Sequence, residues 1–76
     1  MAETREERLR IVAKGKCRAA TRSFGGRIKY LPSIAGMICQ LSEAEEDCYA
    51  TSKEAVAAAE AFRDVARRKL EEEFGR

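Results

Sequence analysis

Residues 8–22 read RLRIVAKGKCRAATR, and the class of fold depends on how this run is interpreted. Every basic residue in the run occupies an even position, and the odd positions carry no charge. The cations are Arg8, Arg10, Lys14, Lys16, Arg18 and Arg22. Because successive side chains of a strand point to opposite faces, this alternation predicts extended chain with one apolar side and one positively charged side.

A helix is the alternative for the same residues. At about 100° per residue, the cations would scatter around the whole helix and leave no clean apolar stripe to bury. We therefore predict a strand over residues 8–22. A helical turn or a frayed tail remains an alternative for residues 3–8. The run is longer than a typical strand, so Gly15 is expected to mark a bend, a bulge or a break into two pieces.

Gly25-Gly26 follows the run and fits a two-residue hairpin loop, which needs positive φ at one or both positions. The predicted cross-strand pairs are Phe24 with Arg27, Ser23 with Ile28, Arg22 with Lys29, and Thr21 with Tyr30. This register places Ile28 and Tyr30 on the apolar side with Cys17, Ala19 and Thr21. Arg22 and Lys29 then face each other on the charged side, and this repulsion is unfavourable by some tenths of a kcal/mol. The cost is tolerated if an anion lies between the two side chains or if both side chains point into water.

Weaker signals mark the middle of the chain. Pro32 cannot donate a ladder hydrogen bond, so the second strand is expected to end there or to lie at a sheet edge. Ala35-Gly36 predicts a turn. We expect a third strand over residues 37–41 and a brief final strand over residues 48–50. Ser42-x-x-Glu45 is typical of a cap on one short helical turn, and a solvated acidic loop is the alternative.

The C-terminal segment predicts a helix over residues 51–74. Thr51-x-x-Glu54 forms a capping box, with Ser52 as an alternative cap, and the alanine-rich residues 55–62 are strong helix formers. One stripe of this helix is expected to pack on the sheet, with Phe62 as its anchor; it comprises Ala55, Ala59, Phe62, Ala66 and Leu70. The opposite face predicts ion pairs one turn apart: Asp64–Arg68, Arg67–Glu71, Arg68–Glu72 and Lys69–Glu73.

These elements predict an α+β fold, with a small antiparallel sheet of about three strands packed on one C-terminal α-helix. The chain of 76 residues is expected to form a single domain. The strands and the hairpin are expected in residues 8–41. An acidic loop and a short strand are expected in residues 42–50, and the helix in residues 51–74.

No apolar run approaches the ~20 residues that span a bilayer, and residues 1–5 do not resemble a secretory signal. We therefore expect a cytoplasmic protein that does not contact membranes.

The residue types argue against catalysis. The sequence has no histidine, which excludes nucleophiles of the Ser-His and Cys-His kind. Its three cysteines, Cys17, Cys39 and Cys48, lack metal or redox spacing, and an odd number argues against a disulfide framework. Residues 43–47 (EAEED) lack the alternating ligands and the glycine of a calcium loop. We expect no enzymatic activity, no cofactor and no metal.

Charge is distributed unevenly along the chain. Residues 1–40 carry nine Lys or Arg against three Asp or Glu, while residues 41–76 carry six against ten. Such asymmetry favours an anionic partner for the basic half. The predicted binding residues are Lys14, Lys16, Arg18, Arg22, Arg27, Lys29 and Tyr30, with Phe24 as a further aromatic side chain for stacking. A solvated outer face of the sheet, a phosphate-contacting surface and a surface for an acidic protein all remain open.

Two resemblances bear on these alternatives. The segment YATSKEAVAAA, residues 49–59, resembles the last strand and helix of integrase arm-binding and ethylene-response-factor DNA-binding domains, and is similar to the end of double-stranded-RNA-binding domains. In the integrase and ethylene-response-factor families, a three-stranded sheet enters the major groove. The sheet of the ethylene-response-factor family carries tryptophans, and this chain has none. The RNA-binding family has several lysines at the start of the helix, where this chain has only Lys53. By size and composition, the chain also resembles phage-encoded accessory proteins such as anti-CRISPR inhibitors.

The residues and the resemblances lead to two functional hypotheses. The first is a non-enzymatic module that engages nucleic acid, or a nucleic-acid-binding site, through a basic sheet face. The alternative is a phage-encoded, anti-CRISPR-like inhibitor that binds a host protein complex through the same face or through the acidic loop at residues 43–47. The expected partners are accordingly a nucleic acid or an acidic, nucleic-acid-handling protein.

Overall fold

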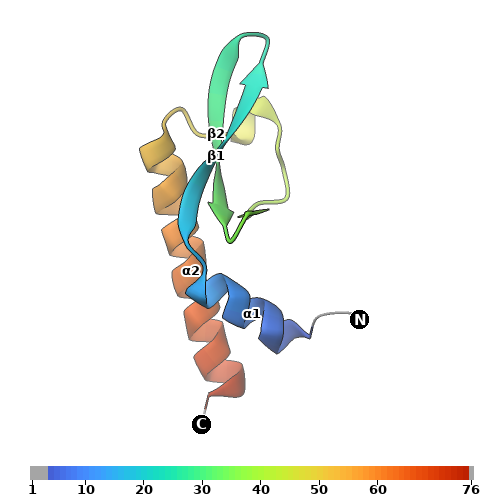
Figure 1. Ribbon diagram of the computed structural model, residues 1–76, viewed down its shortest axis with the longest axis vertical. Coiled ribbons are helices and arrows are strands. Elements are labelled where there is room, and N and C mark those ends of the chain that lie inside the picture. The colour runs from blue at the N-terminus through green and yellow to red at the C-terminus, as the bar shows by residue number, and fades with distance from the viewer. Residues whose placement is uncertain (1–3, 76) are drawn as a thin grey trace.

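Residues 4–75 are the part of the chain that this computed structural model describes. The elements are α1 (Arg5–Lys14), β1 (Cys17–Phe24), β2 (Arg27–Ile34), β3 (Met37–Ile38), the 3-10 turn η1 (Glu45–Asp47) and α2 (Ser52–Phe74). The sheet is antiparallel with strand order β1-β2-β3, and α2 packs against it (Figure 1). The predicted α+β class is confirmed, and a full helix, α1, precedes the sheet where we predict a strand with at most a helical turn over residues 3–8.

The prediction of extended chain over residues 8–14 is wrong, because α1 is a capped helix. The Thr4 hydroxyl accepts a hydrogen bond from the Glu7 N–H at 3.1 Å and donates one to the Glu7 carboxylate at 3.1 Å. One turn further on, Arg10 donates to Glu6 at 2.7 Å. Together these contacts satisfy the start of the helix and hold opposite charges on its surface.

A narrow apolar stripe lets α1 pack despite its many cations. Leu9, Val12 and Ala13 follow the i, i+3, i+4 spacing of one helix face; Val12 and Ala13 are buried and Leu9 is half-buried. Gly15 ends the helix, and its N–H donates to the Val12 carbonyl at 3.2 Å. Of the bend, bulge or break predicted at Gly15, the structure has a break, although it separates a helix from a strand rather than two strand pieces.

The β1–β2 hairpin has the predicted register. All four expected pairs are present, and the ladder continues to Cys17 opposite Ile34. Gly25 and Gly26 both adopt positive φ, at 59° and 90°. The two-residue loop is therefore the turn that the paired glycines predict.

Pro32 neither ends β2 nor occupies an edge strand, so that prediction is wrong. β2 is the central strand and continues to Ile34. Tyr30 turns its backbone N–H and carbonyl towards Tyr49, and Pro32, two residues later, faces the same way. The missing N–H of Pro32 therefore removes no bond to β1, while its carbonyl accepts from the Cys39 N–H at 2.9 Å.

The remaining strands are shorter than predicted. The turn at Ala35-Gly36 is confirmed, with positive φ at both residues. The third strand, predicted over residues 37–41, covers only Met37–Ile38. The brief strand predicted over residues 48–50 is a single bridge between Tyr49 and Tyr30.

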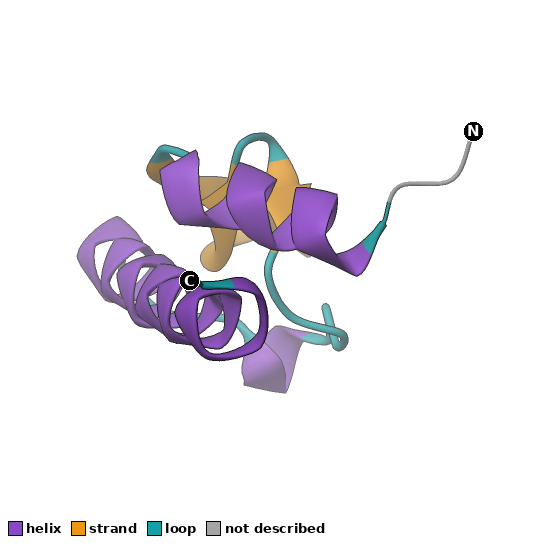
Figure 2. Cartoon of the chain, turned by 90° about the horizontal axis from the view of Figure 1, so that it is seen from below, coloured by secondary structure: helices purple, strands orange, loops and turns teal. Residues whose placement is uncertain are grey.

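The helix α2 is confirmed over Ser52–Phe74. The Thr51 hydroxyl accepts from the Glu54 N–H at 3.2 Å, and the Gly75 N–H donates to the Glu71 carbonyl at 2.9 Å. Among residues 4–75, none of the four predicted ion pairs along α2 forms. Instead Arg67 donates to the Ala13 carbonyl at 3.0 Å, and Glu73 pairs with Arg5 at 2.9 Å. These two contacts join α2 to α1, which lies alongside it in Figure 2.

The helix α2 contributes alanines to the core rather than an aromatic anchor, while β2 contributes the largest fully buried side chains, Leu31 and Ile34. Ala55 and Ala59 have no exposed surface, and Ala59 packs in one cluster with Val12, Ile34 and Ala66. Phe62 is 45% exposed, so its predicted role as the anchor is wrong. The small alanine side chains let α2 approach the sheet closely, and the larger side chain of Phe62 therefore lies at the margin of the interface between them.

Candidate functional site

The hairpin register places four cations on one face of two strands. Arg22 lies directly opposite Lys29, and Arg27 lies opposite Phe24. Paired residues share a face, and residues two apart in a strand share it too, so Arg18 belongs to the same side. We call Arg18, Arg22, Arg27 and Lys29 the cationic hairpin face.

Three predicted site residues lie outside this face. Lys14 is the last residue of α1, so the strand alternation that predicts it on the same side as the strand cations does not apply to it. Tyr30 pairs with Thr21 and points to the opposite side of the sheet. Lys16 precedes β1, but its carbonyl accepts a hydrogen bond from the Ala35 N–H at 3.3 Å, which extends the β1–β2 pairing by one residue. Because Lys16 lies two residues before Arg18, its side chain points to the same side of the sheet as the cationic hairpin face.

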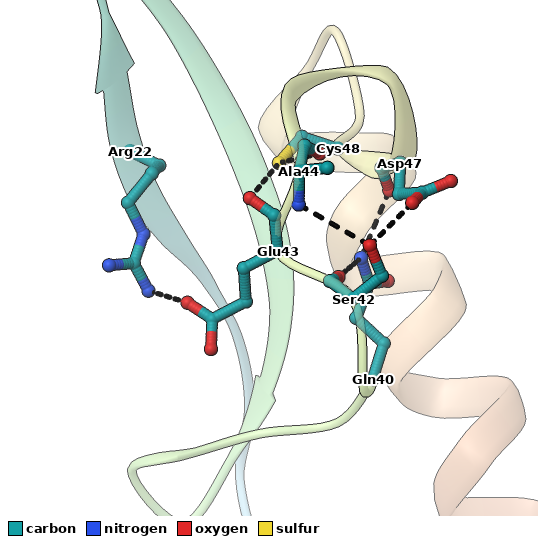
Figure 3. A network of polar contacts seen from close by, with 7 residues as sticks. All are labelled: Arg22, Gln40, Ser42, Glu43, Ala44, Asp47 and Cys48. Carbon is teal, nitrogen blue, oxygen red and sulfur yellow. Dashed lines mark hydrogen bonds and ion pairs between the residues drawn. The ribbon is translucent and has the colours of Figure 1, made fainter.

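The acidic loop between β3 and α2 neutralises half of the cationic hairpin face. Arg27 forms a two-bonded ion pair with Glu45, through Nε to Oε2 at 2.6 Å and Nη2 to Oε1 at 2.8 Å. Arg22 pairs with Glu43, as Figure 3 shows. Within residues 4–75, Arg18 and Lys29 form no ion pair, so they are the cations of the face whose side-chain nitrogens no carboxylate contacts directly.

Hydrogen bonds within the loop hold these carboxylates in place. The Ser42 hydroxyl donates to the Asp47 carboxylate at 2.5 Å, and the Gln40 amide donates to the carbonyls of Ser42 at 2.8 Å and Asp47 at 3.0 Å (Figure 3). The Cys48 thiol lies 3.3 Å from the Ala44 carbonyl. The short helical turn predicted here exists as η1, but its N-cap is Ala44 rather than Ser42, and no side-chain hydrogen bond caps it.

The ion pairs shift the titration of the loop. The hydrogen bonds from Arg27 lower the pKa of Glu45, and the nearby charge of Lys29 lowers it further. The same contact raises the pKa of Arg27. Both groups are therefore fixed in their charged forms at neutral pH, and the contact between them is an ion pair rather than a neutral hydrogen bond.

The intramolecular carboxylates are the part of the site that was missed at the sequence level. The sequence predicts a solvated loop, a short capped turn or a protein-binding surface for residues 43–47, whereas in the structure Glu43 and Glu45 bind the hairpin cations of the same chain. The opposite net charges of the two halves of the sequence are the signal that could have indicated this pairing.

The thiols of the described residues are not activated as nucleophiles by their surroundings. All three cysteines are free and half-buried, and burial raises the pKa of the Cys39 thiol, which disfavours the nucleophilic thiolate. Among residues 4–75, no three cysteine, aspartate or glutamate side chains lie close enough together to hold a metal ion. What the arrangement offers chemically is a set of guanidinium and ammonium donors for anionic oxygens.

No helix in residues 4–75 combines the length and the apolar character needed to cross a membrane. Comparisons with protein-family models, with curated proteins and with solved structures found nothing that matches this chain.

Proposed function

We propose that this protein is a non-enzymatic module that binds nucleic acid through the cationic hairpin face. The observation that carries the proposal is the β1–β2 register, which gathers cations from two strands onto one side of the hairpin. A nucleic-acid backbone presents a regular row of phosphates, and clustered Arg and Lys side chains bind such a row by releasing its counterions. Phe24 shares this face, is half-buried, and is the aromatic side chain available to stack on a base.

The shape of the molecule supports the same proposal. The tip of the hairpin extends beyond the first turn of α2 and beyond the acidic loop at one end of the molecule, as Figure 1 shows. A two-stranded ribbon fits the major groove of a duplex, which is about 12 Å wide. In the DNA-binding families that residues 49–59 resemble, a sheet likewise contacts the groove while a helix supports it.

The acidic loop regulates how strongly this surface attracts phosphate. The carboxylates of Glu43 and Glu45 occupy the positions on Arg22 and Arg27 that phosphate oxygens would take. Arg18 and Lys29 are free to make the first contacts. If only these two neutralise phosphates, the slope of log affinity against log salt is about −1.8, and displacement of both loop carboxylates would steepen it to about −3.6.

The ion pairs also favour a second candidate function, a protein inhibitor of the anti-CRISPR type that binds a host complex. Cations beside carboxylates form a surface of mixed sign, which suits a protein with matched charges better than a polyanion. This candidate predicts that a pull-down from host cells recovers a stoichiometric protein, and that reversing the charge of Arg18 or Lys29 prevents the recovery. Recovery of nucleic acid alone would exclude it.

Fluorescence anisotropy with labelled duplex DNA, duplex RNA and single strands tests the first candidate. We expect binding at ~50 mM salt that weakens steeply as salt is added. Replacing Arg18 and Lys29 together with Gln should weaken binding by about tenfold or more, since two phosphate contacts are lost. The control replaces Arg68 and Lys69 on α2, which removes the same charge and should change affinity by no more than about twofold. Absence of binding at ~50 mM salt, or equal losses in both double variants, would exclude the proposed surface.

A further inference from the structure

Exposed apolar side chains gather on a side of the molecule that the proposed function does not use. Four of the large apolar side chains exposed in residues 4–75 border two neighbouring hollows: Met37, Leu41, Phe62 and Val65. The Leu41 side chain is fully exposed. Concentration of such side chains in one place is typical of a surface that another molecule covers.

The two hollows adjoin, and we call them together the groove. The larger, of about 360 Å³, lies between α1, β3 and the residues that follow β3. The smaller, of about 160 Å³, lies between α1 and α2, the two helices seen side by side in Figure 2. Both are lined by Arg8, Val12 and Phe62, so the hollows adjoin at these residues and together extend from Leu41 to Val65.

The charges at the rim of this groove are all positive. Arg8 lines both hollows, Lys69 lines the smaller one, and within residues 4–75 neither side chain forms an ion pair. Arg5 also lines the smaller hollow, and Glu73 partly compensates it. No carboxylate of the described chain lines either hollow. An occupant therefore needs apolar groups for the floor and a negative charge near the middle, where the hollows meet at Arg8.

A symmetric dimer that pairs this groove with the same groove of a second copy does not meet that requirement. A two-fold contact through the groove would bring Arg8 and Lys69 of one copy towards the same residues of the other, and like charges in a closed interface repel. A nucleic acid matches the charge but does not match an apolar floor. An amphipathic helix matches both features, because its apolar side chains recur along one face and an acidic side chain can lie between them.

We propose that the groove between α1, α2 and β3 binds an amphipathic α-helix of a partner protein. Apolar side chains about two turns apart on that helix fill the two hollows, and an acidic side chain between them pairs with Arg8. The proposal is independent of nucleic-acid binding, since the groove shares no residue with the cationic hairpin face.

Synthetic peptides provide the test. The first is a fluorescent alanine-based helical peptide with Leu at two positions seven residues apart and Glu at the two positions midway between them; the second has Lys in place of Glu. We expect the acidic peptide to bind the full chain about tenfold more tightly than the basic one, which corresponds to one close charge pair. Arg8→Glu should reverse this preference. The control Arg10→Glu, on the same helix but outside both hollows, should leave it unchanged.

The apolar part of the proposal has its own variant. Leu41→Ser changes a fully exposed side chain, so the fold should persist, as circular dichroism can verify, while the acidic peptide binds at least about tenfold more weakly. Equal binding of both peptides, no binding of the acidic peptide at ~1 mM, or full affinity in Leu41→Ser would overturn the proposal. Sedimentation that shows dimers which Leu41→Ser dissociates would also overturn it, in favour of a second copy as the occupant.

Discussion

At the scale of single residues, Gly15 shows how space rather than backbone conformation fixes an amino acid. Its φ of −70° and ψ of 154° are ordinary extended values that any residue adopts. A Cβ atom at this position, however, would overlap the Cγ2 methyl of Ile34 and would lie 3.0 Å from the Ile11 carbonyl oxygen. Because Ile34 is fully buried, it has little room to move.

Gly15→Ala should therefore destabilise the protein by about 1–3 kcal/mol, the usual cost of overpacking a core. Urea denaturation measures the change. Combining Gly15→Ala with Ile34→Leu, which removes the overlapping Cγ2 methyl, should cost less than the sum of the two single changes. Strict additivity of the two free-energy changes would show that the overlap is not the cause.

Glu45 makes stability depend on pH with a definite sign. Its hydrogen bonds with Arg27 lower its pKa in the folded protein below the value of about 4.3 expected for an unfolded chain. The contribution of this pair is therefore fully present above about pH 4.3 and is lost as the pH falls through the lowered pKa. Glu45→Gln should be less stable than the wild type at pH 7, and the difference should vanish in acid. A midpoint at or above pH 4.3 for the Glu45 carboxyl carbon in an NMR titration would contradict this account.

At the scale of elements, local signals explain which parts of the fold could be predicted. A pair of glycines fixes the register of the hairpin, and a capping residue with a terminal glycine fixes the bounds of α2, so these two features are predicted correctly, whereas the bounds of the two hairpin strands are not. The helix α1 carries similar signals, Thr4-x-x-Glu7 and the spacing of Leu9, Val12 and Ala13. Its cations also alternate by chance at the strand period, and a strand was predicted for that reason.

Tertiary contacts explain the errors that no local signal could prevent. Phe62 has the periodicity of a buried residue, yet the alanines of the same stripe bring α2 so close to the sheet that the aromatic ring remains at the margin. The third strand ends after Ile38, because the chain leaves the sheet to form the loop that reaches the hairpin arginines.

The core of the fold predicts an order of sensitivity to truncation. Leu31→Ala should cost about 2–5 kcal/mol, because Leu31 is fully buried in the central strand. Phe62→Ala should cost less than about 2 kcal/mol, because the ring is already 45% exposed. Urea denaturation of both variants compares the two losses. A larger loss for Phe62→Ala would indicate that the ring, rather than the alanine face, anchors α2.

At the scale of the whole molecule, opposite charges of the two halves of the chain meet on the hairpin. The strand positions of Arg18, Arg22, Arg27 and Lys29 could be predicted, because alternation and the glycine pair fix a hairpin's faces. The partners of two of them could not be predicted, since the path of residues 40–49 depends on a single bridge from Tyr49 to Tyr30 and on the hydrogen bonds of Gln40. The carboxylates of Glu43 and Glu45 therefore contact Arg22 and Arg27 where phosphate oxygens would bind, at the surface that we propose for nucleic acid.

The most direct test of this account compares the salt dependence of duplex binding in two double variants. Glu43→Gln with Glu45→Gln releases Arg22 and Arg27, whereas Glu60→Gln with Glu72→Gln removes the same charge from exposed positions on α2. We predict that only the first variant binds more tightly than the wild type beyond the effect of net charge, and that its log–log salt slope steepens from about −1.8 towards about −3.6. Equal tightening in both variants, or an unchanged slope in the first, would contradict the assignment of the hairpin as the nucleic-acid-binding surface.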